Sequence, residues 1–100
     1  MAKLGSIQKT LRIKRCVAKY AGKRAELKKI AMNRLLDYET RDQARRALYQ
    51  LPRDSSPTRV RNRCQFTGRS RGFLWVGMSR IAFDQLASSG LLNGFTKASW

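Results

Sequence analysis

The sequence LPRDSSPTRVRNRCQFTGRSRG, residues 51–72, decides the architecture of this chain. It carries six arginines against a single acid, Asp54. Pro52 and Pro57 each push the residue before them toward extended geometry, and the two glycines in the stretch also disfavour a helix. The first half of the stretch is therefore predicted to be extended rather than helical.

An extended backbone places alternate side chains on opposite sides of the chain. Three arginines spaced two residues apart would then share one side: Arg59, Arg61 and Arg63. With no acid to pair them, these guanidinium groups predict a surface that binds phosphate, because the planar guanidinium makes two parallel bonds to phosphate oxygens. The competing interpretation is a solvated basic linker, since runs of charge are commonly exposed.

The composition of the whole chain also indicates a polyanionic partner. One hundred residues form one domain at most, and 22 Lys and Arg against 6 Asp and Glu give a net charge of +16. A compact protein with this charge repels itself, so nucleic acid is the partner that the composition favours.

The same composition argues against an enzyme. The chain has no histidine and few carboxylates, so we predict no catalytic residues, no metal site and no cofactor. Cys16 and Cys64 are distant in the sequence and do not suggest a secreted disulfide framework. The chain contains no run of about 18 apolar residues, so no transmembrane helix is predicted.

Residues 4–34 are predicted to form one long helix or two shorter ones, with a possible break at Gly22. Eleven of the 22 basic residues lie in the first 34 positions, where only Glu26 opposes them. These charges surround the helix instead of occupying one face, which favours a helix that contacts phosphates on several sides. A membrane-active helix would need a clean apolar face, so that alternative is disfavoured.

A second helix is predicted to follow a turn at residues 37–39. Thr40 and Gln43 have the spacing of a capping box, so Thr40 is the predicted N-cap, and Pro52 is predicted to stop the helix. Its apolar face is expected to pack in the core: Ala44, Ala47, Leu48 and Leu51.

The C-terminal part is predicted to contain a short apolar segment and a short helix. The run at residues 73–76 is consistent with a strand or with an aromatic plug, although Phe66, Phe73 and Trp75 could instead stack on bases. Ser79 is the predicted N-cap of the helix, and Gly90 is predicted to end it in a left-handed conformation. The tail at residues 91–100 is expected to be frayed.

Short strings in the second half resemble the family of small-subunit ribosomal protein number fourteen, in its bacterial and organellar form. The match is strongest over residues 51–100, and it rests on many strings in order rather than on one motif. The first half agrees more loosely, through its length and basicity. The strings are LPR (51–53), SSP (55–57), RNRC (61–64), TGR (67–69), SRI (79–81) and KASW (97–100).

The resemblance implies a structural constituent of the ribosome, bound to small-subunit rRNA in the head near the decoding region and beside neighbouring head proteins. The expected fold is mainly α with irregular segments. It has basic N-terminal helices, an extended arginine-rich stretch and a small zinc-knuckle-like C-terminal module without the metal. We expect residues 1–50 to form the helical extension and residues 51–100 the rRNA-binding module. We predict no membrane contact and no homo-oligomer.

Twelve residues are the predicted rRNA contacts. Seven arginines are expected to bind phosphates, and three small polar residues are expected to hydrogen-bond sugar or phosphate. One lysine and one tryptophan near the end are included mainly because of the resemblance. The set is Arg53, Arg59, Arg61, Arg63, Arg69, Arg71, Arg80, Ser55, Ser56, Asn62, Lys97 and Trp100.

One branch of the family binds zinc through two Cys-x-x-Cys pairs, and the resemblance places those positions at Cys64, Thr67, Ser79 and Ala82. A structural zinc site needs four thiolate or imidazole ligands, and only one cysteine is present here. The chain therefore resembles the zinc-free branch, with Cys64 as a small buried residue. Packing of apolar side chains is expected to replace the metal: Phe66, Phe73, Trp75, Ile81 and Phe83.

Two segments depart from the family pattern by being less basic, residues 74–76 and residues 91–96. These departures suggest a mitochondrial lineage in which protein partners replace some rRNA contacts. The expected location is therefore the ribosome of the mitochondrial matrix rather than that of a bacterial cytoplasm or a plastid. The alternative function is a basic nucleoid-type DNA-binding protein, which would share the charge but would not need the SSP and TGR strings.

Overall fold

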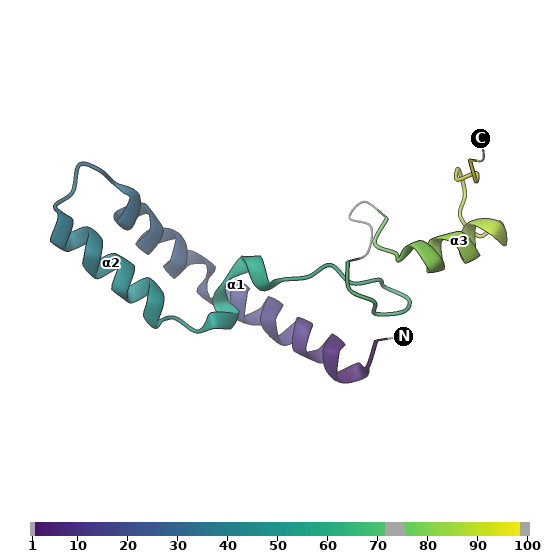
Figure 1. Cartoon of the computed structure of the whole chain (residues 1–100), viewed down its shortest axis with the longest axis horizontal. Helices are drawn as coiled ribbons and strands as arrows, with labels where there is room; N and C mark the ends of the chain where they lie inside the picture. The colour runs from purple at the N-terminus through teal and green to yellow at the C-terminus, as the bar shows by residue number, and fades with distance from the viewer. Residues whose placement is uncertain (1, 72–75, 99–100) are drawn as a thin grey trace. The chain divides into compact units, whose positions relative to one another are not determined.

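A computed structural model describes residues 2–71 and 76–98 of the chain. This part contains three α-helices, α1 (Leu4–Met32), α2 (Tyr38–Gln50) and α3 (Arg80–Ser88), and two 3-10 turns, η1 (Arg53–Ser55) and η2 (Pro57–Arg59) (Figure 1). It has no strand; its single β-bridge joins Arg63 and Ser70 in antiparallel fashion. The prediction of a mainly helical chain is confirmed, and no helix in the described ranges is long and apolar enough to span a membrane.

The contacts divide the chain into two units. Residues 9–60 form the helical unit, and residues 1–8 join residues 61–100 in the C-terminal unit. The predicted division into residues 1–50 and 51–100 concerns the chain on the ribosome and stays a prediction. The helical unit contains most of α1 together with α2, which lie side by side as a hairpin (Figure 1).

Helix α1 runs without interruption through Gly22, so of the two predicted alternatives, one long helix or two shorter ones, the structure has the single helix. Its sequence lacks an acid in the first turn, and Lys29 lies in the last turn, where the negative end of the helix dipole favours it. Only Thr10, Ile13 and Ala31 are buried along the 29 residues of the helix. The rest of its surface, including most of its basic side chains, is exposed at least in part.

Helix α2 begins earlier than predicted. Thr40 lies inside the helix, which starts at Tyr38, and the N-cap is Asp37 without a side-chain hydrogen bond. The first intrahelical bond is donated by the Arg41 amide to the Asp37 carbonyl at 3.2 Å, so the expected turn at residues 37–39 is replaced by the first turn of the helix. The end of α2 at Gln50 agrees with the prediction that Pro52 stops it.

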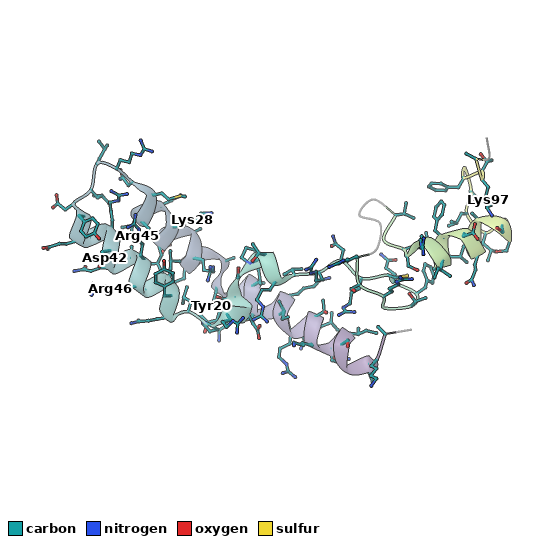
Figure 2. The ribbon with its side chains drawn as sticks, viewed as in Figure 1. Tyr20, Lys28, Asp42, Arg45, Arg46 and Lys97 are labelled. Carbon is teal, nitrogen blue, oxygen red and sulfur yellow. The ribbon has the colours of Figure 1, made fainter. Side chains whose placement is uncertain are left out.

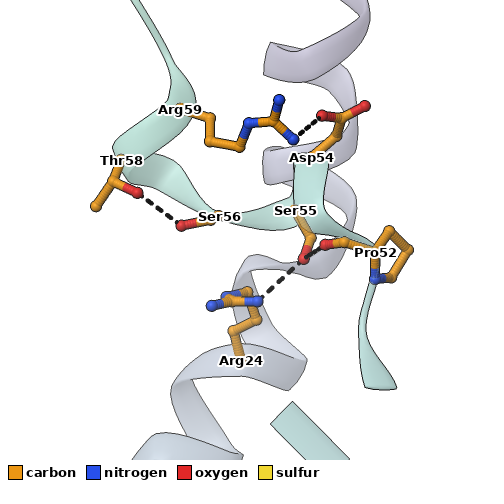
Figure 3. Close-up of polar contacts among 7 residues, drawn as sticks. All are labelled: Arg24, Pro52, Asp54, Ser55, Ser56, Thr58 and Arg59. Carbon is orange, nitrogen blue, oxygen red and sulfur yellow. Dashed lines mark hydrogen bonds and ion pairs between the residues drawn. The ribbon is translucent and has the colours of Figure 1, made fainter. Parts of the chain in front are cut away.

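Residues 53–59 are not extended, contrary to the prediction for the first half of the arginine-rich stretch. The two prolines break the α-helix as expected, but the backbone then curls into η1 and η2. Ser55 is completely buried, and its hydroxyl accepts a hydrogen bond from Arg24 Nη1 of α1 at 3.0 Å while it donates to the Pro52 carbonyl (Figure 3). This bond joins the turn to α1 within the helical unit.

The C-terminal unit has a small core of Cys64, Met78 and Ala82. Burial of Cys64, at 3 % exposure, agrees with the prediction. The expected packing set is only partly correct, because Phe66 is 63 % exposed and Ile81 is 50 % exposed. Phe73 and Trp75, with the predicted apolar run that contains them, lie outside the described residues. The half-buried side chains that pack on the core are Val76, Phe83, Leu86 and Leu92.

Helix α3 begins and ends as the sequence predicts. The Ser79 side chain accepts a hydrogen bond from the Ala82 amide at 3.3 Å, which is the N-cap bond. Gly90 has φ +76°, and the Leu91 amide then bonds the Leu86 carbonyl at 3.1 Å, which closes the C-terminus of the helix.

The described part of the C-terminal tail, residues 91–98, is attached to α3 rather than frayed as predicted. The ring of Phe95 meets the ring of Phe83 edge to face, with centroids 5.3 Å apart. Lys97 Nζ lies 2.9 Å from a carboxylate oxygen of Asp84, although both side chains are well exposed and this ion pair contributes little stability.

Gly68→Ala is expected to destabilise the C-terminal unit more than Gly90→Ala does. Both glycines have positive φ, +72° and +76°, so either alanine costs about 1–2 kcal/mol in the backbone. A Cβ at Gly68 would also lie 2.7 Å from Cδ1 of Ile7, whereas a Cβ at Gly90 would meet nothing within 4 Å. Urea unfolding of the full chain, followed by circular dichroism, should show the lower midpoint for the Gly68 variant. Equal midpoints would mean that the Ile7 side chain moves aside without loss of stability.

Candidate nucleic-acid interface

The second half of the arginine-rich stretch folds back on itself as an irregular hairpin. The Cys64 amide donates to the Arg69 carbonyl and the Arg71 amide donates to the Asn62 carbonyl, each at 2.8 Å, on either side of the bridge between Arg63 and Ser70. The turn of this hairpin is residues 65–67, and Gly68 follows in the left-handed conformation. These bonds bring two pairs of arginines, which the sequence separates by six to ten residues, onto one loop.

Five arginines line one hollow of about 650 Å³ in the C-terminal unit. The hairpin supplies four of them, and the first residue of α3 supplies the fifth, Arg80. The seven residues that line the hollow include no Asp or Glu. They are Arg61, Arg63, Arg69, Ser70, Arg71, Ser79 and Arg80.

The electrostatics of this hollow favour an anion. Like charges that face each other across paired strands repel, so the hairpin holds its arginines together at a cost. Ser79 and Arg80 are at the N-terminus of α3, where the partial positive charge of the helix adds to that of the guanidinium groups. A phosphate in the hollow would relieve the repulsion and accept hydrogen bonds from several donors at once.

Two details of the hairpin backbone support this arrangement. Arg63 Nη1 donates to the Gly68 carbonyl at 2.8 Å, which fixes its side chain across the turn. Arg71 has φ +63°, a left-handed conformation that costs a non-glycine residue about 1 kcal/mol or more. Such strain persists only where neighbouring contacts impose it, and it is found most often at binding sites.

The predicted row of arginines on one side of an extended chain is wrong at its first member. Arg59 ends η2 in the helical unit, and its Nη1 lies 2.7 Å from Oδ1 of Asp54, the one acid of the stretch (Figure 3). The absence of a pairing acid, assumed from the sequence, therefore does not hold for Arg59. Arg53, in η1, is exposed in the same unit and does not line the hollow.

The other predicted contacts are scattered. Ser55 is buried and uses its hydroxyl within the helical unit, and the Ser56 hydroxyl bonds that of Thr58 at 2.8 Å (Figure 3). Asn62 is exposed beside the hairpin, and its carbonyl accepts the bond from Arg71. Lys97, which is labelled in Figure 2, pairs with Asp84. Trp100 lies outside the described residues.

Sequence reasoning missed two residues of the hollow, Ser70 and Ser79. Ser79 was predicted only as an N-cap; its position beside Arg80 could have placed it here, because an N-cap residue lies where an anion meets the helix end. Ser70 has no comparable signal, since it enters the hollow only through the bridge to Arg63.

The Cys64 side chain lies among hydrogen-bond donors. Burial raises the pKa of this thiol, but bonds from the Thr67 side chain and from the backbone N–H groups of Ser79, Thr67 and Phe66 outweigh it and lower the pKa from 9.0 to about 6. The Thr67 amide lies 3.5 Å from Sγ. The thiolate is therefore the favoured form at neutral pH.

The residues at the four positions expected from the zinc-binding branch do not fit zinc. They offer one thiolate, two hydroxyl groups and a methyl group, whereas structural zinc takes four thiolate or imidazole ligands. Within residues 2–71 and 76–98, no group of three or more His, Cys, Asp or Glu side chains could hold a metal ion.

Comparison with known proteins is consistent with a small-subunit ribosomal protein. The family model described as Ribosomal protein S14p/S29e matches residues 47–99. Over 101 aligned positions that cover the whole of both chains, the sequence is 50 % identical to small ribosomal subunit protein uS14 of Protochlamydia amoebophila and to that of Hyphomonas neptunium. It is equally similar to protein uS14A of Myxococcus xanthus.

These relatives are bacterial proteins, and none of them points to the mitochondrial lineage predicted from the two less basic segments. The match also covers the N-terminal half of the chain, where the resemblance of short strings was loose.

Proposed function

The chain belongs to the Ribosomal protein S14p/S29e family, and from this we propose that it anchors small-subunit rRNA through the arginine hollow of its C-terminal unit. As a member of this family it is a structural constituent of the small ribosomal subunit and not an enzyme. The observation that carries the proposal is the hollow itself, where five arginines gather without a carboxylate.

The hollow suits a bend of the RNA backbone better than a straight strand. Guanidinium groups from the two arms of a hairpin and from a helix N-terminus approach it from different directions, so they can bind phosphates that are not consecutive. Arg63 is held across the turn by its bond to the Gly68 carbonyl, which reduces the side-chain entropy lost on binding. Phosphate contacts of this kind set position and orientation rather than sequence preference.

The helical unit supplies a second, more diffuse basic surface. The exposed Lys and Arg side chains of α1 surround the helix, and Arg53 lies exposed in η1. We assign Ser55 a supporting role, because its hydroxyl joins the turn to Arg24 instead of facing solvent. The remaining predicted contacts, Ser56, Asn62, Lys97 and Trp100, stay proposals, as does the location in the head near the decoding region.

The proposal includes assignment to the zinc-free branch of the family. Two similar contacts support it: the Thr67 amide bonds Cys64 Sγ, and the Ala82 amide bonds Ser79 Oγ at 3.3 Å. In each, the amide three residues later bonds a side-chain acceptor, an arrangement that can fix the turn of the loop and the start of α3 without a metal. Cys64 and Ala82 pack together in the core of this unit.

The bacterial relatives favour a ribosome of the bacterial type. A mitochondrial location stays a prediction that the source of a purified small subunit would decide. Binding of DNA in a nucleoid is not favoured, because the relatives are named as small-subunit ribosomal proteins.

Binding of the full chain to small-subunit rRNA is expected to weaken steeply with salt. If all five arginines of the hollow neutralise phosphates, each releases counterions with a slope of about −0.7, so the logarithm of affinity should fall with the logarithm of salt concentration by about 3 or more. Filter binding between about 50 and 200 mM salt measures this slope. An affinity that stays constant over the range would reject phosphate neutralisation as the binding mechanism.

A further inference from the structure

The tip of the helical hairpin differs from the rest of the chain in both exposure and charge. We define the tip as residues 32–42, the end of α1, the loop and the first turns of α2. Every residue from 32 to 40 is exposed. Four of these are large and apolar, with exposed fractions of 69 % for Met32, 94 % for Leu35, 38 % for Leu36 and 70 % for Tyr38.

The charge of the tip is reversed relative to the whole molecule. Half of the six acids of the chain lie here, against two arginines, so the tip is slightly negative while the protein carries +16. Asp42 pairs with Arg46 on α2 at 2.8 Å (Figure 2). In the part of the chain that the structure describes, neither Asp37 nor Glu39 forms an ion pair.

These properties do not fit an RNA contact. Phosphates repel carboxylates, and the three acids of the tip outnumber its two arginines, whereas α1 and the hollow carry a large excess of Lys and Arg. They fit a protein surface: apolar side chains gain by leaving water, and exposed carboxylates attract basic residues at the rim of an interface. Leu35, the most exposed of the apolar residues, is the natural central anchor.

We propose that the hairpin tip docks into an apolar cleft rimmed by Lys or Arg on another protein of the small subunit. The proposal rests on the proposed function, because it places the partner on the same particle. The apolar residues Met32, Leu35 and Tyr38 enter the cleft, and Asp37 and Glu39 face the basic rim. A second copy of this chain is a poorer occupant, since two acidic tips repel each other.

Photo-crosslinking in assembled small subunits tests the proposal. A benzophenone amino acid replaces Leu35 in one variant and Ser70, on the rim of the arginine hollow, in another. We expect the probe at position 35 to crosslink to a different ribosomal protein, at a peptide with apolar and basic residues, and the probe at position 70 to crosslink to rRNA. A position-35 probe that reaches only rRNA, a second copy of the chain, or nothing while position 70 reaches rRNA would overturn the docking proposal.

The two proposals fail in different ways. If the chain does not join small subunits, or if the probe at position 70 never reaches rRNA, the proposed function is wrong whatever position 35 contacts. Charge reversal supplies an independent measurement: Asp37→Lys with Glu39→Lys should lower the crosslink yield at position 35 by about tenfold and leave the yield at position 70 unchanged. The Asp37 side chain makes no capping bond, so its replacement removes none from α2. An unchanged yield at position 35 would show that the two acids do not face a basic rim, and that part of the proposal would be wrong.

Discussion

Replacing Arg61, Arg69 and Arg71 together with glutamine is expected to weaken binding to small-subunit rRNA by about a hundredfold or more. All three side chains are exposed and line the same hollow. A hydrogen bond to a charged group contributes about 1.5–3 kcal/mol, and even a strong discount for exposure leaves about 3 kcal/mol for three arginines, or two factors of ten. Glutamine keeps a polar side chain of moderate length, so the hairpin backbone, which is joined by main-chain bonds, should persist.

The control for this experiment removes the same number of charges elsewhere. Lys29, Arg34 and Arg46 are exposed in the helical unit, outside the unit that holds the hollow, so their replacement by glutamine lowers the net charge equally. Filter binding should show a salt slope that is smaller by about 2 for the hollow variant and a much smaller change for the control. Equal losses in the two variants would mean that total charge, and not the hollow, determines affinity.

Introducing three cysteines, Thr67→Cys, Ser79→Cys and Ala82→Cys, is expected to create a zinc site with Cys64. The thiolate of Cys64 is already favoured at neutral pH, because N–H donors surround it and its pKa is about 6. Metal ligands must be deprotonated, so this residue is prepared for binding. The bond between the Thr67 amide and Cys64 holds positions 64 and 67 close to each other, and the bond between the Ala82 amide and Ser79 does the same for positions 79 and 82.

The gain in stability should be large. Zinc at about a thousand times its dissociation constant would add about 4 kcal/mol to the free energy of unfolding, which exceeds the roughly 1 kcal/mol lost with the Ser79 N-cap. Elemental analysis should find one zinc per chain of the variant, and cobalt should give the absorption of a tetrahedral thiolate site. Adding Cys64→Ser to the triple variant should reduce binding sharply, whereas Cys16→Ser should not. A triple variant that binds no zinc would show that the four positions do not converge.

The helices could be predicted from the sequence because their signals are local. Pro52 removes a backbone donor and stops α2, and Ser79 caps α3 through a bond to the amide three residues later. The predicted start of α2 was wrong, and the reason is also local. Thr40 has good capping-box spacing, but the backbone carbonyl of Asp37 begins the helix without any side-chain cap, and no sequence pattern reports such a bond.

The composition of the hollow could be predicted in part. The charge of the stretch identified Arg61, Arg63, Arg69 and Arg71, and Arg80 was included among the predicted phosphate contacts. Alternation along an extended strand did not explain why they meet. They meet because the chain turns back after Cys64, and Gly68 and Arg71 adopt left-handed conformations that period-two reasoning ignores. The pairing of Arg59 with Asp54 and the burial of Ser55 depend on η1 and η2, which follow from three-dimensional packing.

The first residues of the chain make their tertiary contacts with residues that are synthesised much later. The Ala2 amide bonds the Thr67 carbonyl at 3.2 Å, and Gly68 leaves room for Ile7, so residues 2–8 belong to a unit whose other residues follow position 60. During synthesis their contacts with Thr67 and Gly68 cannot form until more than half of the chain has left the translating ribosome. Helices α1 and α2 can pair early. The unit that holds the hollow folds late, because it depends on contacts between residues about sixty positions apart in the sequence, and such contacts are slow to form. Binding to RNA through the hollow is therefore coupled in time to completion of the chain, because an unfinished chain lacks the α3 end of the hollow.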